Sequence, residues 1–286
     1  MVPVRPVIVS VGEILWDRFP KEAQLSGAPT NVAIHAAALG AESWLVSAVG
    51  NDSLGNMALS RLDAAGVYRD TVPQLLSRPT GTVLMKLDAK GAMKYDFAED
   101  VAWDHLAWSP RTEQVVKRAE ALTFGTLAQR SQTSRDTVRH AAGATSPRAW
   151  RLFDVNLRQN YYDSETIRTS LTLANAVKLN ERELPEVARR TGVRGAAAVA
   201  DPLGRGLLAA GGRRGLRRLG RGVHRSATRG TARGPVARPG GHEGVCARGL
   251  CAIAAAGDAG DPAGVPVASR LQRQQPYHAP AMLRAA

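Results

Sequence analysis

The chain has 286 residues, with 38 Lys and Arg against 25 Asp and Glu, which gives a net charge of +13. It contains no run of about eighteen apolar residues, so no membrane span is predicted. Two cysteines, Cys246 and Cys251, are too few for a disulfide framework, and Met1–Arg5 lacks the layout of a secretory signal. We therefore expect a cytoplasmic protein with one large α/β domain or two modest ones.

The charge and composition change near residue 194. Residues 1–193 hold 23 Lys and Arg against 21 Asp and Glu, whereas residues 194–286 hold 15 Arg against 4 acidic residues. In this second part, Leu, Ile, Val and Phe make up 15 of 93 residues, below the roughly 20% at which a highly charged chain is expected to be disordered. We expect a folded domain over 1–193 and a disordered or poorly packed Arg-, Gly- and Ala-rich tail over 194–286.

The first part alternates between strand and helix patterns. Short apolar runs predict buried strands at 7–11, 44–49, 121–124, 150–155 and 176–179. Helix patterns lie between them, at 29–39, 53–65, 131–142 and 163–174. Repeated βα units indicate a doubly wound, mostly parallel sheet that binds ligands at the carboxyl ends of its strands. A predicted hairpin at about 80–98 interrupts the rhythm and indicates a small β lid.

Polar residues gather where the predicted strands end. Glu13 and Asp17 follow the first strand, and the segment 26–31 opens an apolar helix. The segments 154–158 and 178–183 end two later strands. Carboxylates, amides and glycine N–H groups in one crevice suit a polyhydroxylated ligand, because each hydroxyl both donates and accepts hydrogen bonds.

Six of these segments, in order, resemble the ribokinase-like (PfkB-type) carbohydrate kinases, most closely the fructokinase branch. They are GEILWD, SGAPTNVAIHAAALG, VGNDSLG, PTGTV, FDVNLR and KLNERE. The resemblance covers about residues 5–193 and implies a doubly wound α/β domain with a β lid over the sugar. It also implies transfer of the ATP γ-phosphoryl group to a hydroxyl of fructose or a related hexose, with Mg²⁺, and a homodimer formed through the lid.

The resemblance assigns sugar-binding roles to four residues. Asp17 matches the acidic residue that binds sugar hydroxyls, Gly27 and Asn31 match a Gly-rich turn and an Asn at the sugar, and Arg158 matches an arginine near the transferred phosphate. Ser26 departs from the usual paired glycines, which leaves the sugar undetermined. Simpler interpretations are a loop carboxylate for Asp17 and local backbone bonding for Asn31.

The resemblance also assigns Asn180 and Glu183 to an Asn-x-x-Glu element that organises Mg²⁺ and phosphate through water, with no direct protein ligand to the metal. Their spacing is equally that of a capping box, in which two side chains satisfy free N–H groups at a helix start.

The nucleotide loop and the catalytic Gly-Ala-Gly-Asp element of the family are not recognisable after residue 193. The nearest string ends at Asp258, but Gly260, Pro262 and Gly264 forbid the apolar helix that the motif needs. We therefore expect this chain to lack the anion pocket and catalytic base, and to be doubtful as a catalyst. We hypothesise a reading-frame error in GC-rich DNA, which resequencing would test.

Two other interpretations remain open. The tail could be a nucleic-acid arm in which Arg213, Arg214, Arg217, Arg218 and Arg221 neutralise phosphates. Regular Arg-Gly-Gly repeats and interleaved aromatic residues are absent, however, so we expect no nucleic-acid binding. Alternatively, the chain is an inactive sugar-binding fragment.

Overall fold

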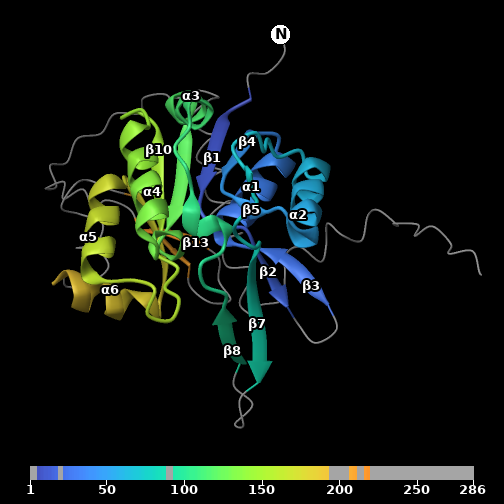
Figure 1. The fold of residues 1–286 in the computed structure, drawn as a ribbon. Coiled ribbons are helices and arrows are strands. Elements are labelled where there is room, and N and C mark those ends of the chain that lie inside the picture. The colour runs from blue at the N-terminus through green and yellow to red at the C-terminus, as the bar shows by residue number, and fades with distance from the viewer. Residues whose placement is uncertain (1–4, 19–21, 88–92, 193–205, 211–215, 220–286) are drawn as a thin grey trace, which may run out of the picture.

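A seven-stranded sheet forms the centre of the protein in a computed structural model (Figure 1). The structure describes residues 5–18, 22–87, 93–192, 206–210 and 216–219. The strand order is β13-β12-β11-β10-β9-β1-β4, and every neighbouring pair is parallel except β12 with β13. The strands of this sheet are β1 (Val7–Val11), β4 (Glu42–Val46), β9 (Ala121–Gly125), β10 (Trp150–Asp154), β11 (Ala176–Asn180), β12 (Gly206–Ala210) and β13 (Leu216–Leu219).

Helices cover both faces of this sheet, so the predicted doubly wound architecture is confirmed. Helices α1 and α2 lie on one side, and α3 to α6 lie on the other (Figure 1). Side chains alternate accordingly along β1, because Val9 packs in the cluster of α3 to α6 and Ile8 packs with α1. The helices are α1 (Ala28–Ala38), α2 (Ser53–Ala64), α3 (Pro110–Arg118), α4 (Gln132–Ala144), α5 (Ser164–Leu173) and α6 (Glu183–Thr191), with short 3₁₀ helices at Ala102–His105 and Leu127–Gln129.

Polar residues set the start of most helices. The side chains of Asp52, Ser109, Ser131 and Asp163 each accept a hydrogen bond from a backbone N–H in the first turn of the following helix. Helix α1 differs, because its N-cap is a glycine, Gly27, with no side chain to accept a bond. This leaves the backbone N–H groups at the start of α1 to other partners.

A second sheet of four strands forms the lid, which projects from one end of the body (Figure 1). Its order is β3-β2-β7-β8, and it contains the predicted hairpin as β7 and β8. The two further strands were not predicted, and one of them, β2, pairs in parallel with β7. The lid strands are β2 (Leu15–Arg18), β3 (Ala23–Ser26), β7 (Gly81–Leu87) and β8 (Met93–Phe97), and a separate small pair is β5 (Val49–Gly50) with β6 (Gln74–Leu75).

A buried arginine fixes the lid to the body. Arg130 forms an ion pair with Asp104 at 2.7 Å, and both side chains are at least nine-tenths buried. Its guanidinium lies over the ring of Trp103 at 4.0 Å and over that of Tyr161 at 4.9 Å, and it donates to the carbonyl of Ala98, just after β8. The end of the lid is therefore held by residues from three separate segments.

Two described segments lie beyond the boundary expected at residue 193. Strands β12 and β13 continue the central sheet from β11, so the sheet does not end with the last strand predicted from sequence. Arg217 and Arg218, assigned to a nucleic-acid arm in one interpretation, lie in β13 opposite Ala209 and Leu208. The division into a 1–193 domain and a tail stays a prediction.

Candidate functional site

The carboxyl ends of four parallel strands meet at one edge of the central sheet. The register aligns Val11 with Phe124, Gly125 with Asp154, and Asp154 with Lys178. The lid begins at this edge, because β2 follows β1 after three residues (Figure 1). Polar groups at the ends of β1, β10 and β11 are thereby brought to the base of the lid, where the sequence predicted a ligand.

Asp17 and Arg158 lie close enough to interact electrostatically, although they come from distant parts of the chain. Asp17 lies in lid strand β2 and is half-buried. Burial raises the pKa of Asp17, while a hydrogen bond from Ser26 and the positive charge of Arg158 act to lower it. A carboxylate of the lid and the arginine that follows β10 therefore lie within electrostatic range of each other, and both can hydrogen-bond a hydroxylated ligand.

Gly27 forms the turn that carries Asn31 to the same edge. Its φ is +116°, and a Cβ at this position would lie 2.4 Å from the carbonyl oxygen of Glu13. The backbone N–H of Asn31 donates to the Gly27 carbonyl at 2.9 Å, whereas its side chain has no hydrogen bond to another described residue. The local bonding offered as a simpler role for Asn31 is therefore not seen within the described residues.

Glu13 belongs to this turn and was not assigned a role from the sequence. The residue is 2% exposed, and its Oε1 accepts a hydrogen bond from the backbone N–H of Ala28 at 3.2 Å. Its carbonyl oxygen accepts a bond from the Thr30 hydroxyl at 2.9 Å. Burial raises the pKa of Glu13 to about 7. The signal that could have identified it is an acidic residue two positions after a fully buried strand.

Arg158 lies in a loop with an unusual backbone. Asn156 and Gln159 on either side have φ values of +36° and +45°, which non-glycine residues seldom adopt. The Arg158 guanidinium is half-buried and donates to the Leu157 carbonyl at 3.1 Å. The amide of Gln159 donates to the Tyr95 carbonyl in lid strand β8. The loop is thus held in contact with the lid.

Asn180 and Glu183 form the reciprocal bonds of a capping box. Asn180 Oδ1 accepts from the N–H of Glu183, and Glu183 Oε2 accepts from the N–H of Asn180, both at 2.9 Å. Glu183 also uses Oε1, which accepts from the N–H of Leu157 at 3.0 Å. Burial raises the pKa of Glu183. Both carboxylate oxygens are occupied by backbone donors, so the residue links two strand ends.

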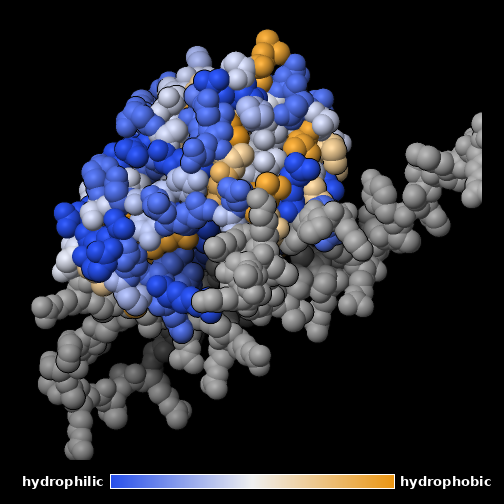
Figure 2. Space-filling model, turned by 60° about the horizontal axis from the view of Figure 1, so that its bottom comes forward, coloured by the Kyte–Doolittle hydropathy of each residue, from blue (hydrophilic) through white to orange (hydrophobic). Residues whose placement is uncertain are grey.

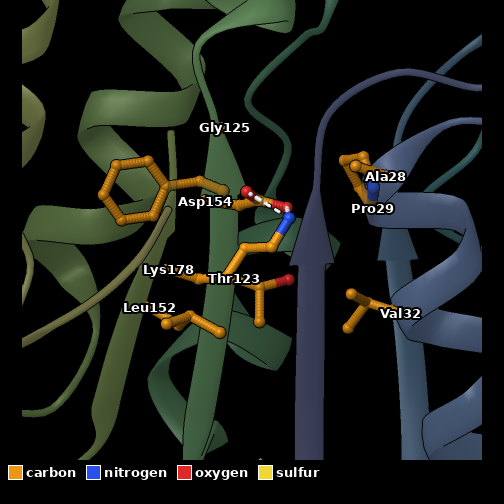
Figure 3. Close-up of a pocket in the computed structure, with 9 residues that line it drawn as sticks. Ala28, Pro29, Val32, Thr123, Gly125, Leu152, Asp154 and Lys178 are labelled. Carbon is orange, nitrogen blue, oxygen red and sulfur yellow. Dashed lines mark hydrogen bonds and ion pairs between the residues drawn. The ribbon is translucent and has the colours of Figure 1, made fainter. Parts of the chain in front are cut away.

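A buried ion pair lies between these elements. Lys178 Nζ is 3.1 Å from Asp154 Oδ1, and the Lys178 side chain is 2% exposed. Figure 3 shows the Lys178 amine pointing to the Asp154 carboxylate, across a narrow pocket from the start of α1. The pocket is lined by Ala28, Pro29, Val32, Thr123, Phe124, Gly125, Leu152, Asp154 and Lys178. Both charged residues stood at predicted strand ends, but neither was assigned a site role from the sequence.

Other predicted site features lie outside the described residues. Asp258, the nearest candidate for a catalytic base, is one of them, and so are Arg213, Arg214 and Arg221 of the proposed arm. Within the described ranges, no three His, Cys, Asp or Glu side chains gather as a direct metal site requires. No helix in the described part of the chain is long and apolar enough to cross a bilayer.

Comparison with known proteins identifies relatives among sugar kinases. The model of the pfkB family of carbohydrate kinases matches residues 22–216. An uncharacterized sugar kinase from Pyrococcus horikoshii is 30% identical over 196 residues, which are 62% of this chain and 63% of that protein. A fructokinase from Escherichia coli is 29% identical over 186 residues, which are 58% of this chain and 55% of that protein. The chain spans less than two thirds of the length of these relatives.

Solved structures show the same fold. The P. horikoshii kinase has a TM-score of 0.63 at 25% identity, covering 74% of this chain and 73% of that one. Its complex with ATP has a TM-score of 0.61 at 27% identity, with the same coverage. A fructokinase from Xylella fastidiosa with bound ATP has a TM-score of 0.65 at 21% identity, covering 76% of each chain, and supports the fold alone. The predicted mostly parallel α/β fold with a lid is confirmed.

Proposed function

Because the chain belongs to the pfkB family of carbohydrate kinases, we propose that it binds a hexose such as fructose at the base of the lid. The reaction of its lineage is then phosphorylation of a sugar hydroxyl by ATP. The single observation that carries the proposal is that polar groups from the lid and from the ends of β1 and β10 gather at the base of the lid, where the positive charge of Arg158 acts to lower the pKa of Asp17. This arrangement supports a site that combines a hydroxyl acceptor with a positive charge for the phosphoryl group.

Each residue in the proposed site has a role that its position allows. Asp17 accepts hydrogen bonds from sugar hydroxyls, and the side chain of Asn31 is available to donate or accept. Gly27 lets the backbone approach the sugar closely. Arg158 orients the sugar through Asp17 and neutralises charge on the transferred group.

ATP and Mg²⁺ are the cofactors that we propose, and when bound they supply the phosphoryl group and part of the charge that stabilises its transfer. The described residues fit an indirect role towards Mg²⁺. Glu183 has both oxygens bonded to backbone N–H groups, and the Oδ1 of Asn180 accepts two such bonds. We propose that these two side chains act on the metal through water, and that Arg158 faces the phosphate.

We further propose that this chain binds the sugar but turns it over poorly. The sequence after residue 193 contains no recognisable Gly-Ala-Gly-Asp helix, and preorganised N–H donors and a base supply much of the rate in such transfers. Binding without turnover is therefore the behaviour that we expect.

Calorimetric titration of the purified full chain with D-fructose tests the binding site. We expect Asp17→Asn to weaken binding about tenfold or more, since a hydrogen bond to a charged group contributes about 1.5–3 kcal/mol. The exposed carboxylate Glu22→Gln is the matched control and should bind as the wild type does. Equal affinity of D17N and wild type, or no binding at all, contradicts the site. A coupled assay with ATP should give no turnover above background, and clear turnover contradicts loss of the catalytic element.

We also propose a cytoplasmic homodimer that pairs through the lid. The lid is a small sheet with two outer strands, β3 and β8. Among the described residues, the large hydrophobic side chains that are exposed are scattered over several elements, and Leu84 is the member on the lid. In Figure 2, which brings this end of the molecule forward, the described surface is mostly hydrophilic. Sedimentation of wild type and Leu84→Asp tests the dimer, which should dissociate in the variant; a monomeric wild type contradicts it.

A further inference from the structure

The carboxyl group of Glu13 holds the turn that opens α1. Gly27 caps this helix without a side chain, so the first N–H groups of α1 depend on other acceptors. Glu13 Oε1 takes the N–H of Ala28, and its carbonyl takes the hydroxyl of Thr30. A Cβ on Gly27 would meet that same carbonyl, so the backbone of Glu13 packs closely against the turn.

The other carboxyl oxygen of Glu13, Oε2, is buried and has no hydrogen-bond partner among the described residues. A charged carboxylate with an unpaired buried oxygen is costly, whereas the neutral acid is much less so. Two charged groups act on it, Asp154 from the end of β10, which favours the neutral form, and Arg158 from the next loop, which favours the charged form. The first turn of α1 has no titratable side chain.

We propose that Glu13 is a positioning residue for the sugar-binding turn, which it clamps when its carboxyl is neutral and loosens when its carboxyl is charged. The expected effect on sugar binding rests on the proposed function, in which Gly27 and Asn31 of this turn contact the sugar. Burial raises the pKa of Glu13 more than the backbone hydrogen bonds lower it, so the carboxyl loses its proton near neutral pH. A rise in pH through neutrality should then weaken sugar binding.

Hydrogen exchange of the full-length chain tests the clamp without a ligand. The reporters are the amides of Ala28 and Asn31, and the amide of Gly55, which Asp52 holds at the start of α2, is the internal control. After correction for intrinsic rates, protection of the reporters should fall about tenfold between pH 6 and pH 8. That is the change in ionisation expected for a carboxyl that titrates near 7.

Glu13→Gln keeps the acceptor for Ala28 and cannot ionise, so its reporters should stay protected at both pH values. Glu13→Ala should lose protection at both. A wild type with constant protection, or an E13Q variant that shows the same fall, overturns the inference. If E13A does not fold, the comparison of wild type with E13Q still decides.

Titration of the same proteins with D-fructose separates this inference from the proposed function. We expect the wild-type dissociation constant to rise several-fold from pH 6 to pH 8, and that of E13Q to stay constant. Fructose binding with a pH-independent turn overturns the role of Glu13 and leaves the sugar site intact. The expected exchange pattern without fructose binding overturns the sugar site and leaves the clamp.

Discussion

Glu183 holds Leu157 across two strand ends, since its Oε1 accepts the Leu157 N–H at 3.0 Å while its Oε2 accepts the N–H of Asn180. The first of these bonds joins the start of α6 to the loop that follows β10. That loop continues directly into Arg158. A residue that the family resemblance assigned to a phosphate site thus also supports the loop that carries the arginine.

We expect Glu183→Gln to destabilise the protein by about 1–3 kcal/mol, because the amide places a donor against one of two backbone donors. It should also weaken fructose binding, since the loop of Arg158 loses its support. Urea denaturation and calorimetry measure the two effects. Glu181→Gln, an exposed carboxylate in the same turn, is the control, and an E183Q variant as stable as E181Q would show that the bond to Leu157 is unimportant.

Two glycines should respond in opposite directions to the same substitution. Gly27→Ala forces an L-residue to φ +116° and places its Cβ 2.4 Å from a backbone oxygen, so we expect a loss of at least about 1–3 kcal/mol. Gly143 lies in α4 with nothing within 4 Å of an added Cβ, so Gly143→Ala should stabilise by about 0.5–1 kcal/mol. Thermal unfolding compares them. Similar melting temperatures for the two variants would contradict the tight contact with Glu13.

The Lys178–Asp154 pair should show strong coupling. Lys178→Met leaves a carboxylate in a largely buried position, and removal of one partner from such a pair costs about 3–5 kcal/mol. The double variant with Asp154→Leu should recover a large part of this loss, because no charge then remains buried. A double-mutant cycle in urea provides the measurement, and strictly additive losses would contradict a direct interaction.

Asp52 should make stability depend on pH in acid. Burial alone would raise the pKa of Asp52, but hydrogen bonds from Thr80 and Gly55 outweigh it and hold the pKa below its usual value. A depressed pKa means that the contribution is present above the unfolded pKa, near 3.8, and is lost as the pH falls through the lower folded value. Asp52→Ala should cost about 1 kcal/mol at pH 7.

The loss in D52A should become smaller below pH 4, where the wild-type carboxylate takes up its proton. Asp163→Ala, which removes the cap of α5, is a comparison variant on another helix. Denaturation of all three proteins from pH 3 to pH 7 tests this. A difference between D52A and wild type that stays constant over the range would contradict it.

The sequence predicted the parts of the fold whose signals are local. Strands β1 and β9 are buried along their whole length, and their mostly apolar sequences, each broken by one Ser or Thr, were sufficient to predict them. Lid strands β2 and β3 have four residues each, too few for a pattern, and were missed. Helix α3 was also missed, although Ser109 and Pro110 give a start signal, because Val115 and Val116 are its main apolar residues.

The candidate site also contains some features that local sequence patterns predict and others that they do not. The positions of Asp17, Gly27, Asn31 and Arg158 follow from motifs at strand ends, which short segments can show. The electrostatic effect of Arg158 on Asp17 and the hydrogen bonds of Glu13 to Ala28 and Thr30 join segments that are separate in the sequence. No local pattern encodes such contacts, so their chemistry became visible only in the folded arrangement.

The pairing of β2 with β7 has a consequence for the order of folding. Leu15 aligns with Gly81, so this part of the lid closes only after the intervening chain, with α1, β4 and α2, has been brought together. Contacts between residues far apart in sequence form slowly, because the chain loses the entropy of the intervening loop before these contacts can stabilise it. We expect the lid to be a late-folding unit, and the carboxylate of Asp17 to reach the nascent core last.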